Sequence, residues 1–201
     1  MGLGPTEFSF SSWNPSEVPE GVHPRWAVLG RSNVGKSSFL NALVHPYKDF
    51  RTGRTPGVTK GLVAVKVRLA KSEESILELV DMPGFGFALM GDGDGERWAK
   101  LGEVLKETSR VRGVQWVWLV DPTRDPGDVE RDLMTWLRQE VYYFVFTKAD
   151  KVTRNARAGI DKKWEHFGLA SAEKPIWVSS LKGEGMDTFG KAARNFVRNA
   201  E

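Results

Sequence analysis

The chain has 201 residues, of which 40% are hydrophobic and 27% are charged, and this composition excludes a disordered chain. Its formal net charge of +3 is small compared with that of strongly basic nucleic-acid-binding proteins. It contains no cysteine, which excludes disulfides and thiolate metal sites. Its apolar runs are far shorter than the roughly 20 residues of a membrane-spanning helix, and residues 1–13 lack a signal-peptide pattern, so a cytoplasmic protein without membrane contact is expected.

Residues 1–23 are predicted to form an N-terminal arm, since prolines and serines are frequent there, with Phe8–Phe10 as a short edge strand. Residues 24–201 are predicted to form one domain in which strands and helices alternate. The expected strands are Trp26–Leu29, Leu62–Ala70, Ile76–Val80, Val114–Val120, Tyr142–Phe146 and Ile176–Val178. The expected helices are Lys36–Val44, Glu96–Thr108, Val129–Glu140, a stretch within Asn155–Phe167, and Met186–Asn199.

This alternation predicts an α/β fold of three layers, with a mostly parallel six-stranded sheet and helices on both faces. A polar turn joins Leu62–Ala70 to Ile76–Val80, so these two strands are expected to form a hairpin with one antiparallel strand. The near-continuous apolar runs Val114–Val120 and Tyr142–Phe146 are typical of strands buried on both faces. Glycine and aspartate alternate over Gly91–Gly95, which is expected to be a mobile loop.

The segment Gly30–Ser37, GRSNVGKS, matches the phosphate-binding pattern G-x-x-x-x-G-K-[ST] between a predicted strand and a predicted helix. Such a loop directs backbone N–H groups and the helix N-terminus at the phosphates of a nucleotide. Lys36 is expected to reach the β- and γ-phosphates, and Ser37 to bind Mg²⁺. The predicted nucleotide-binding residues here are Gly30, Arg31, Ser32, Asn33, Val34, Gly35, Lys36, Ser37 and Ser38.

Asp81-Met82-Pro83-Gly84 directly follows the strand Ile76–Val80, which would place the Asp81 carboxylate beside Mg²⁺ and the Gly84 N–H near the γ-phosphate. A second segment precedes the hairpin and consists of Arg54-Thr55-Pro56-Gly57-Val58-Thr59. Such a segment can close over the nucleotide and bind Mg²⁺ through a threonine hydroxyl. Thr59 is preferred for that hydroxyl, with Thr55 as the alternative.

The metal ligands are therefore predicted to be Ser37, Thr59 and Asp81, and the transition-state stabilisers Lys36, Thr59 and Gly84. The sequence identifies no residue that activates the attacking water. The nucleotide-binding set predicted from these two segments comprises Gly57, Val58, Thr59, Asp81, Met82, Pro83 and Gly84.

The base pocket is predicted at Thr147-Lys148-Ala149-Asp150, which follows a buried strand at the sheet edge where ligands of open α/β folds bind. Asp150 can accept hydrogen bonds from N1–H and the 2-amino group of guanine, and adenine lacks that amino group. Lys148 can lay its stem along the base. Val178-Ser179-Ser180-Leu181 is expected to present backbone N–H groups to the guanine oxygen.

The segments GRSNVGKSS, TPGVT, DMPGFGF, TKAD and SSLKGEG resemble the EngB (YihA/YsxC) family of bacterial GTPases, over roughly residues 24–200. The resemblance implies a GTP-dependent switch in assembly of the large ribosomal subunit, needed for normal cell division and septation. Leu119–Pro126 also resembles a family segment, with Asp121 and Arg124 at matching places, but the sequence assigns them no role.

Two positions depart from the general GTPase pattern. Thr147 stands where asparagine is more usual, and Phe85 where many switch GTPases have the glutamine that orients water. Because phenylalanine cannot orient water, slow intrinsic hydrolysis that a partner or metal ion raises is expected. Asn33 is a candidate ligand for K⁺, through its carboxamide oxygen, as in related potassium-activated GTPases.

Ribosomal RNA is a candidate partner because cations cluster in two parts of the sequence, although such runs more often form a solvated helix face. Trp164 and His166 can stack on a base, but tryptophan at helical spacing more often packs in the core.

The protein is expected to be a monomer. The alternatives are a nucleotide-gated interaction factor of the division machinery with incidental hydrolysis, and an ATP-binding P-loop enzyme. The clustered cations that make ribosomal RNA a candidate partner are Lys148, Lys151, Arg154, Arg157, Lys162 and Lys163, together with Arg51, Arg54 and Lys60 in and beside the Arg54–Thr59 segment.

Overall fold

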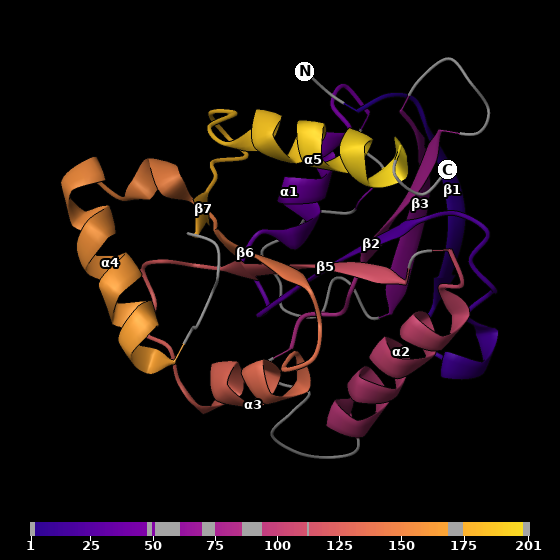
Figure 1. The fold of residues 1–201 in the computed structure, drawn as a ribbon, viewed down its shortest axis with the longest axis horizontal. Helices are drawn as coiled ribbons and strands as arrows, with labels where there is room; N and C mark the ends of the chain where they lie inside the picture. Colours follow the sequence, from indigo (N-terminus) through magenta and orange to yellow (C-terminus); the bar gives the residue numbers. More distant parts are fainter. Residues whose placement is uncertain are drawn as a thin grey trace.

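The computed structural model describes residues 3–47, 50, 61–69, 75–85, 94–111, 113–168 and 175–198. The middle layer is a seven-stranded sheet with the order β1-β3-β4-β2-β5-β6-β7 (Figure 1). β3 is antiparallel to both of its neighbours, and all other neighbouring pairs are parallel. The strands are β1 (Thr6–Ser12), β2 (Arg25–Gly30), β3 (Leu62–Arg68), β4 (Ile76–Asp81), β5 (Val114–Val120), β6 (Tyr142–Phe146) and β7 (Ile176–Trp177).

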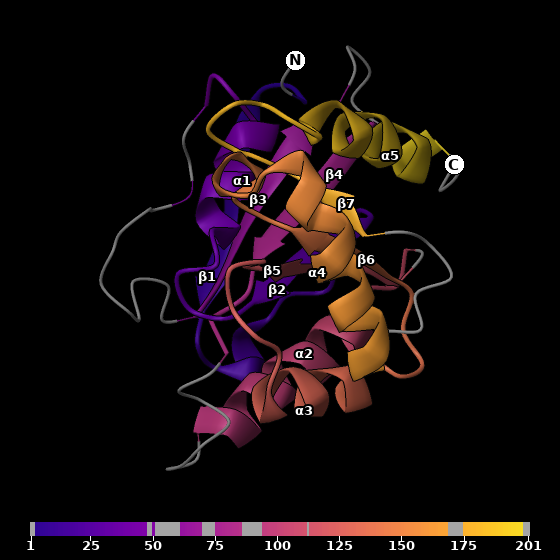
Figure 2. The same cartoon turned by 90° about the vertical axis from the view of Figure 1, so that its left-hand side faces the viewer.

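Helices cover both faces of the sheet, as Figures 1 and 2 show. α1 (Lys36–Leu43) and α5 (Met186–Arg198) pack on one face. The other face carries α2 (Asp94–Thr108), α3 (Asp128–Trp136) and α4 (Arg154–Phe167). Two short 3₁₀ helices, η1 (Pro15–Glu17) and η2 (Ala149–Lys151), precede β2 and α4. The predicted three-layer α/β fold with one antiparallel strand is confirmed.

The core consists of one apolar layer on each side of the sheet, because successive strand residues point to opposite faces. In β5, Trp116 and Trp118 join the layer under α2, α3 and α4, whereas Val117 and Leu119 join the layer under α1 and α5. Trp164 of α4 is 1% exposed, and its ring centroid lies 6.2 Å from that of Trp118. Its indole therefore belongs to the core and cannot stack on a base.

Most elements differ from the sequence prediction by one to four residues at an end, and three of these differences concern β1, α2 and α3. β1 is longer than Phe8–Phe10 and pairs with β3 from Thr6 to Ser12, which adds a seventh strand to the six predicted in the domain. α2 begins at Asp94, within the glycine–aspartate run expected to be a loop. α3 ends at Trp136 because the chain turns there to enter β6, and Glu140 accepts a hydrogen bond from the Trp116 indole at 3.1 Å. The division into an arm of residues 1–23 and a domain of residues 24–201 stays a prediction.

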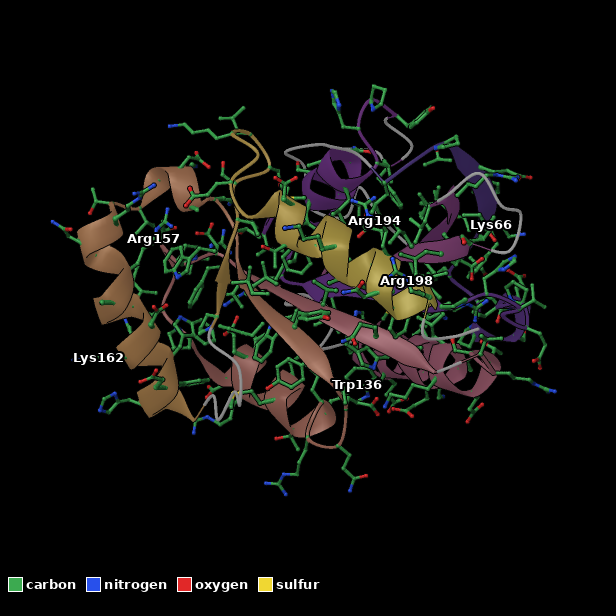
Figure 3. All side chains as sticks on the ribbon, turned by 45° about the horizontal axis from the view of Figure 1, so that its top comes forward. Lys66, Trp136, Arg157, Lys162, Arg194 and Arg198 are labelled. Carbon is green, nitrogen blue, oxygen red and sulfur yellow. The ribbon has the colours of Figure 1, made fainter. Side chains whose placement is uncertain are left out.

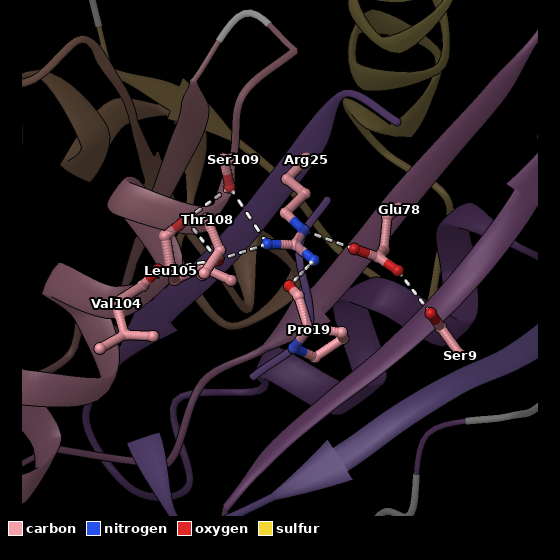
Figure 4. A network of polar contacts seen from close by, with 8 residues as sticks. All are labelled: Ser9, Pro19, Arg25, Glu78, Val104, Leu105, Thr108 and Ser109. Atoms are coloured by element: carbon pink, nitrogen blue, oxygen red, sulfur yellow. Dashed lines mark hydrogen bonds and ion pairs between the residues drawn. The ribbon is translucent and has the colours of Figure 1, made fainter. Parts of the chain in front are cut away.

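A buried polar network joins the N-terminal segment to the sheet and to the end of α2 (Figure 4). Arg25 and Glu78 are partners in the parallel β2–β4 ladder, and their side chains form an ion pair of 2.5 Å while each residue is at most 3% exposed. The guanidinium also donates to Thr108 Oγ1 at 2.8 Å and to the Pro19 carbonyl at 2.9 Å, and Ser9 Oγ donates to Glu78 at 2.5 Å. The network connects β1, β2, β4 and α2.

None of the helices in the described ranges is both long and apolar enough to span a bilayer.

Candidate nucleotide-binding site

The phosphate loop runs from the end of β2 into α1. Gly35 adopts φ +107°, in the left-handed region that favours glycine, and it precedes the first turn of α1 without a side chain that could cap it. The N–H groups of that first turn are therefore available to an anion, which the helix dipole also favours. Asn33 has φ +64° and an exposed side chain, and Ser38 is exposed as well.

Lys36 lies inside this loop and is 7% exposed. Its ammonium group donates to the Gly30 carbonyl at 3.1 Å and to the Arg31 carbonyl at 3.4 Å. Burial lowers the pKa of Lys36, and the negative charge of Asp81 opposes that shift. A cation held in a tight loop by carbonyl oxygens is well placed to exchange those contacts for phosphate oxygens.

The two predicted metal ligands on described residues lie together. Ser37 Oγ, at the start of α1, donates to Asp81 Oδ2, at the end of β4, over 2.7 Å. A hydroxyl and a carboxylate side by side fit Mg²⁺, which usually takes few protein oxygens and completes its shell with water and phosphate. The third predicted ligand, Thr59, lies outside the described residues, as do Thr55, Gly57 and Val58.

The segment after Asp81 packs directly against the phosphate loop. A Cβ on Gly84 would lie 2.9 Å from Ser32 Cα and 3.0 Å from its nitrogen, so no larger residue fits here without a backbone shift. The Ser32 N–H donates to the Phe85 carbonyl at 3.3 Å, and the indole of Trp98 in α2 donates to the Pro83 carbonyl at 2.9 Å. The loop, the end of β4 and α2 are thus in direct contact.

Phe85 is fully buried, and its ring centroid lies 5.9 Å from that of Trp98. A buried ring that packs on another aromatic residue has neither the chemistry nor the position to orient an attacking water.

The predicted base pocket is assembled around the ends of β6 and β7. Thr147 Oγ1 donates to the Val34 carbonyl of the phosphate loop at 2.8 Å. Thr147, which stands where asparagine is more usual, therefore connects the end of β6 to the phosphate loop. Ser179 is fully buried and donates to Asp150 Oδ1 at 2.5 Å, and this hydrogen bond is the main reason for the lowered pKa of Asp150. The Asp150 carboxylate is thus oriented and ionised.

Three contacts at the site were not predicted from the sequence. Lys148 Nζ donates to the Asn33 carbonyl at 3.0 Å and forms an ion pair of 2.6 Å with Asp121. Arg31 Nη1 lies 3.3 Å from the buried carboxylate of Glu130 in α3. The sequence signals for Asp121 were its place at the end of a buried strand and its position in the family-like segment Leu119–Pro126, but neither predicted its contact with Lys148, and Glu130 gave no signal.

The remaining predicted residues lie along the same edge. Met82 and Ala149 are buried, and the Val178 carbonyl accepts the Ala149 N–H at 3.0 Å. In the loop after β7, Ser180 is half-buried and Leu181 is 83% exposed. The structure therefore brings together three predicted groups from separate parts of the chain: the phosphate loop, the Asp81–Gly84 segment and the base pocket.

Residues 25–148 match the protein-family model described as a 50S ribosome-binding GTPase. Curated relatives named as probable GTP-binding protein EngB match almost the whole chain. The relative from Alkaliphilus oremlandii is 32% identical over 90% of this chain and 86% of its own length. The one from Geobacter sp. strain M21 is 38% identical over 90% and 83%.

The chain belongs to the EngB family of GTPases.

Solved structures share the fold. A crystal structure of a probable GTP-binding protein EngB superposes with a TM-score of 0.61 at 19% identity, over 87% of this chain and 99% of that one. Aquifex aeolicus Era bound to GDP and AlF₄⁻ superposes with a TM-score of 0.60 at 20% identity, over 86% and 56%. These likenesses establish the P-loop GTPase fold of this EngB-family chain, and the relatives establish the family.

Proposed function

We propose that this EngB-family GTPase is a Mg²⁺-dependent molecular switch with slow intrinsic hydrolysis that acts on a precursor of the large ribosomal subunit. In this proposal it works in the cytoplasm as a monomer and is needed for normal cell division and septation. One observation carries the proposal: the phosphate loop, the Ser37–Asp81 pair and the Asp150–Ser179 pair converge at one edge of the sheet.

Each group at this edge has a role in binding and hydrolysing GTP. The phosphate-loop N–H groups and Lys36 bind the phosphates, and Ser37 and Asp81, with Thr59, would hold Mg²⁺. When bound, Mg²⁺ neutralises charge on the β- and γ-phosphate oxygens. The packing of Gly84 against Ser32 of the phosphate loop supports a role for its N–H in sensing the γ-phosphate. Loss of that phosphate would release the segment that contacts Trp98 of α2.

The deciding measurement is equilibrium binding of fluorescent GDP and GTP analogues in the presence of Mg²⁺, competed by unlabelled GTP, GDP and ATP. We expect competition by the guanine nucleotides alone. Equal competition by ATP would refute the role of Asp150 and the switch with it.

The buried position of Phe85 supports slow intrinsic hydrolysis, and in this proposal a partner or a cation raises it. We propose that K⁺ binds near the exposed Asn33 side chain and offsets charge on the phosphates. GTP turnover measured in KCl and in NaCl at equal ionic strength should differ, with KCl faster. Equal rates would remove the potassium part of the proposal.

The ribosomal part is supported by the cations of η2 and α4. Lys151, Arg154 and Lys162 are exposed, whereas Arg157 pairs with Glu184 and Lys163 with Asp125. Figure 3 shows Arg157 and Lys162 on α4 at one end of the molecule, with Lys66 at the opposite end of the view. Exposed cations beside a base pocket suit the phosphates of RNA.

Replacing both Arg154 and Lys162 with glutamate is expected to weaken binding of the GTP form to ribosomal particles at least about tenfold and to reduce its salt dependence. The measurement is co-sedimentation with large-subunit particles over a salt series. The matched control replaces the exposed Lys191 and Arg198 of α5 with glutamate. Equal binding by both double variants would exclude α4 as the contact. No sedimentation of the unaltered GTP form would favour the alternative, a nucleotide-gated factor of the division machinery.

A further inference from the structure

We infer that Asp121 is a positioning residue for the base pocket, because it fixes Lys148 in the conformation that receives the base. The inference rests on the proposed binding of guanine nucleotides. It gives a role to a residue for which the sequence provided none.

Asp121 is itself rigidly held. It follows the last residue of β5 and is 7% exposed. One carboxylate oxygen, Oδ1, accepts from the Thr123 N–H at 3.0 Å and from the Thr123 hydroxyl at 2.6 Å. The Asp121 carbonyl accepts the Arg124 N–H at 3.1 Å, which closes a turn. Local hydrogen bonds therefore occupy Oδ1 and direct the other oxygen, Oδ2, away from the turn.

Oδ2 meets Lys148 at 2.6 Å. Burial acts to raise the pKa of Asp121, but the hydrogen bonds from Lys148 and Thr123 outweigh it and the pKa is lowered. The carboxylate is therefore charged at neutral pH. A charged group that is buried and has one cation within reach restricts that cation to a narrow set of positions.

Lys148 needs such restraint. Its backbone is left-handed, with φ +53°, its side chain is 28% exposed, and it is the residue whose stem is expected to cover one face of the base. A lysine side chain carries four rotatable bonds, and fixing them only when nucleotide binds would cost affinity. Two acceptors within the protein, the Asn33 carbonyl and Asp121, hold the ammonium group at 3.0 and 2.6 Å. The stem is thus preorganised across the gap between the phosphate loop and the end of β5.

The test substitutes Asp121→Asn, which keeps the size of the side chain and an oxygen for Thr123 but removes the charge that holds Lys148. We expect the dissociation constants of GDP and of inosine diphosphate both to rise about tenfold, by the same factor, since Lys148 contacts the ring face that both bases share. Inosine lacks the 2-amino group that Asp150 reads. A larger loss for GDP would show that the pocket around Asp150 is disturbed, and would overturn the inference.

The matched control is Asp125→Asn in the same loop, where the carboxylate is 81% exposed and pairs with Lys163. It should bind both nucleotides as the unaltered protein does. In a Lys148→Met background, Asp121→Asn should add no further loss, and an unchanged tenfold loss there would also refute the inference. If Lys148→Met binds both nucleotides too weakly to measure, the ratio of the GDP and inosine diphosphate dissociation constants of Asp121→Asn is the deciding result. Failure of the unaltered protein to bind GDP would instead refute the proposed function.

Discussion

Asp150→Asn is expected to weaken GDP binding by about 10²- to 10³-fold and to create binding of xanthosine diphosphate. A carboxylate can accept from both N1–H and the 2-amino group of guanine, whereas an asparagine amide offers one acceptor and one donor. Xanthine has a carbonyl in place of the 2-amino group and so matches the amide. Because Ser179 holds Asp150 Oδ1 at 2.5 Å, the new side chain should keep the orientation of the old one.

The measurement is competition binding with GDP, xanthosine diphosphate and ADP. Asp132→Asn, at an exposed position of α3, makes the same chemical change away from the site and should leave all three affinities unaltered. Unchanged GDP binding by Asp150→Asn would mean that the Thr147–Asp150 segment does not read the base.

Arg25→Met is expected to lower the free energy of unfolding by about 3–5 kcal/mol, because it leaves the buried Glu78 carboxylate without its compensating charge. Methionine can fill part of the space of the arginine stem, so lost packing makes the smaller contribution. The hydrogen bonds to Thr108 and Pro19 disappear as well. Nucleotide affinity of the folded variant should be unchanged, since Arg25 begins β2 and the phosphate loop starts at the opposite end of that strand.

Urea unfolding monitored by tryptophan fluorescence measures the change. Arg110→Met removes an ion pair with Glu20 in which the side chains are 75% and 57% exposed, and should cost less than about 1 kcal/mol. The double variant Arg25→Met with Glu78→Gln should recover part of the stability, because the uncompensated charge is gone. Equal stability of Arg25→Met and Arg110→Met would show that the network contributes little.

Most of the fold was predictable because its signals are local. All six strands predicted in the domain begin within one residue of their predicted starts, and all five helices begin within two residues of theirs or, for α4, of the predicted range. Apolar runs and helical spacing are properties of short segments. The phosphate loop was predictable for the same reason. The end of α3 was not predictable, since it depends on where β6 lies. The full length of β1 was not predictable either, because it depends on a partner strand at least 50 residues away in the chain.

The sequence by itself determined the phosphate loop, the strand-end positions of Asp81 and Asp150, and the absence of a water-orienting side chain at Phe85. Only the tertiary structure decided that Asp121 holds Lys148, that Arg31 meets Glu130, and that Arg25 pairs with Glu78. These partners lie 27, 99 and 53 residues apart, so their contacts depend on strand order and on which helix covers which face. Local patterns specify neither of these, because a charged residue at a strand end has the same local signature whether it faces solvent or a buried partner.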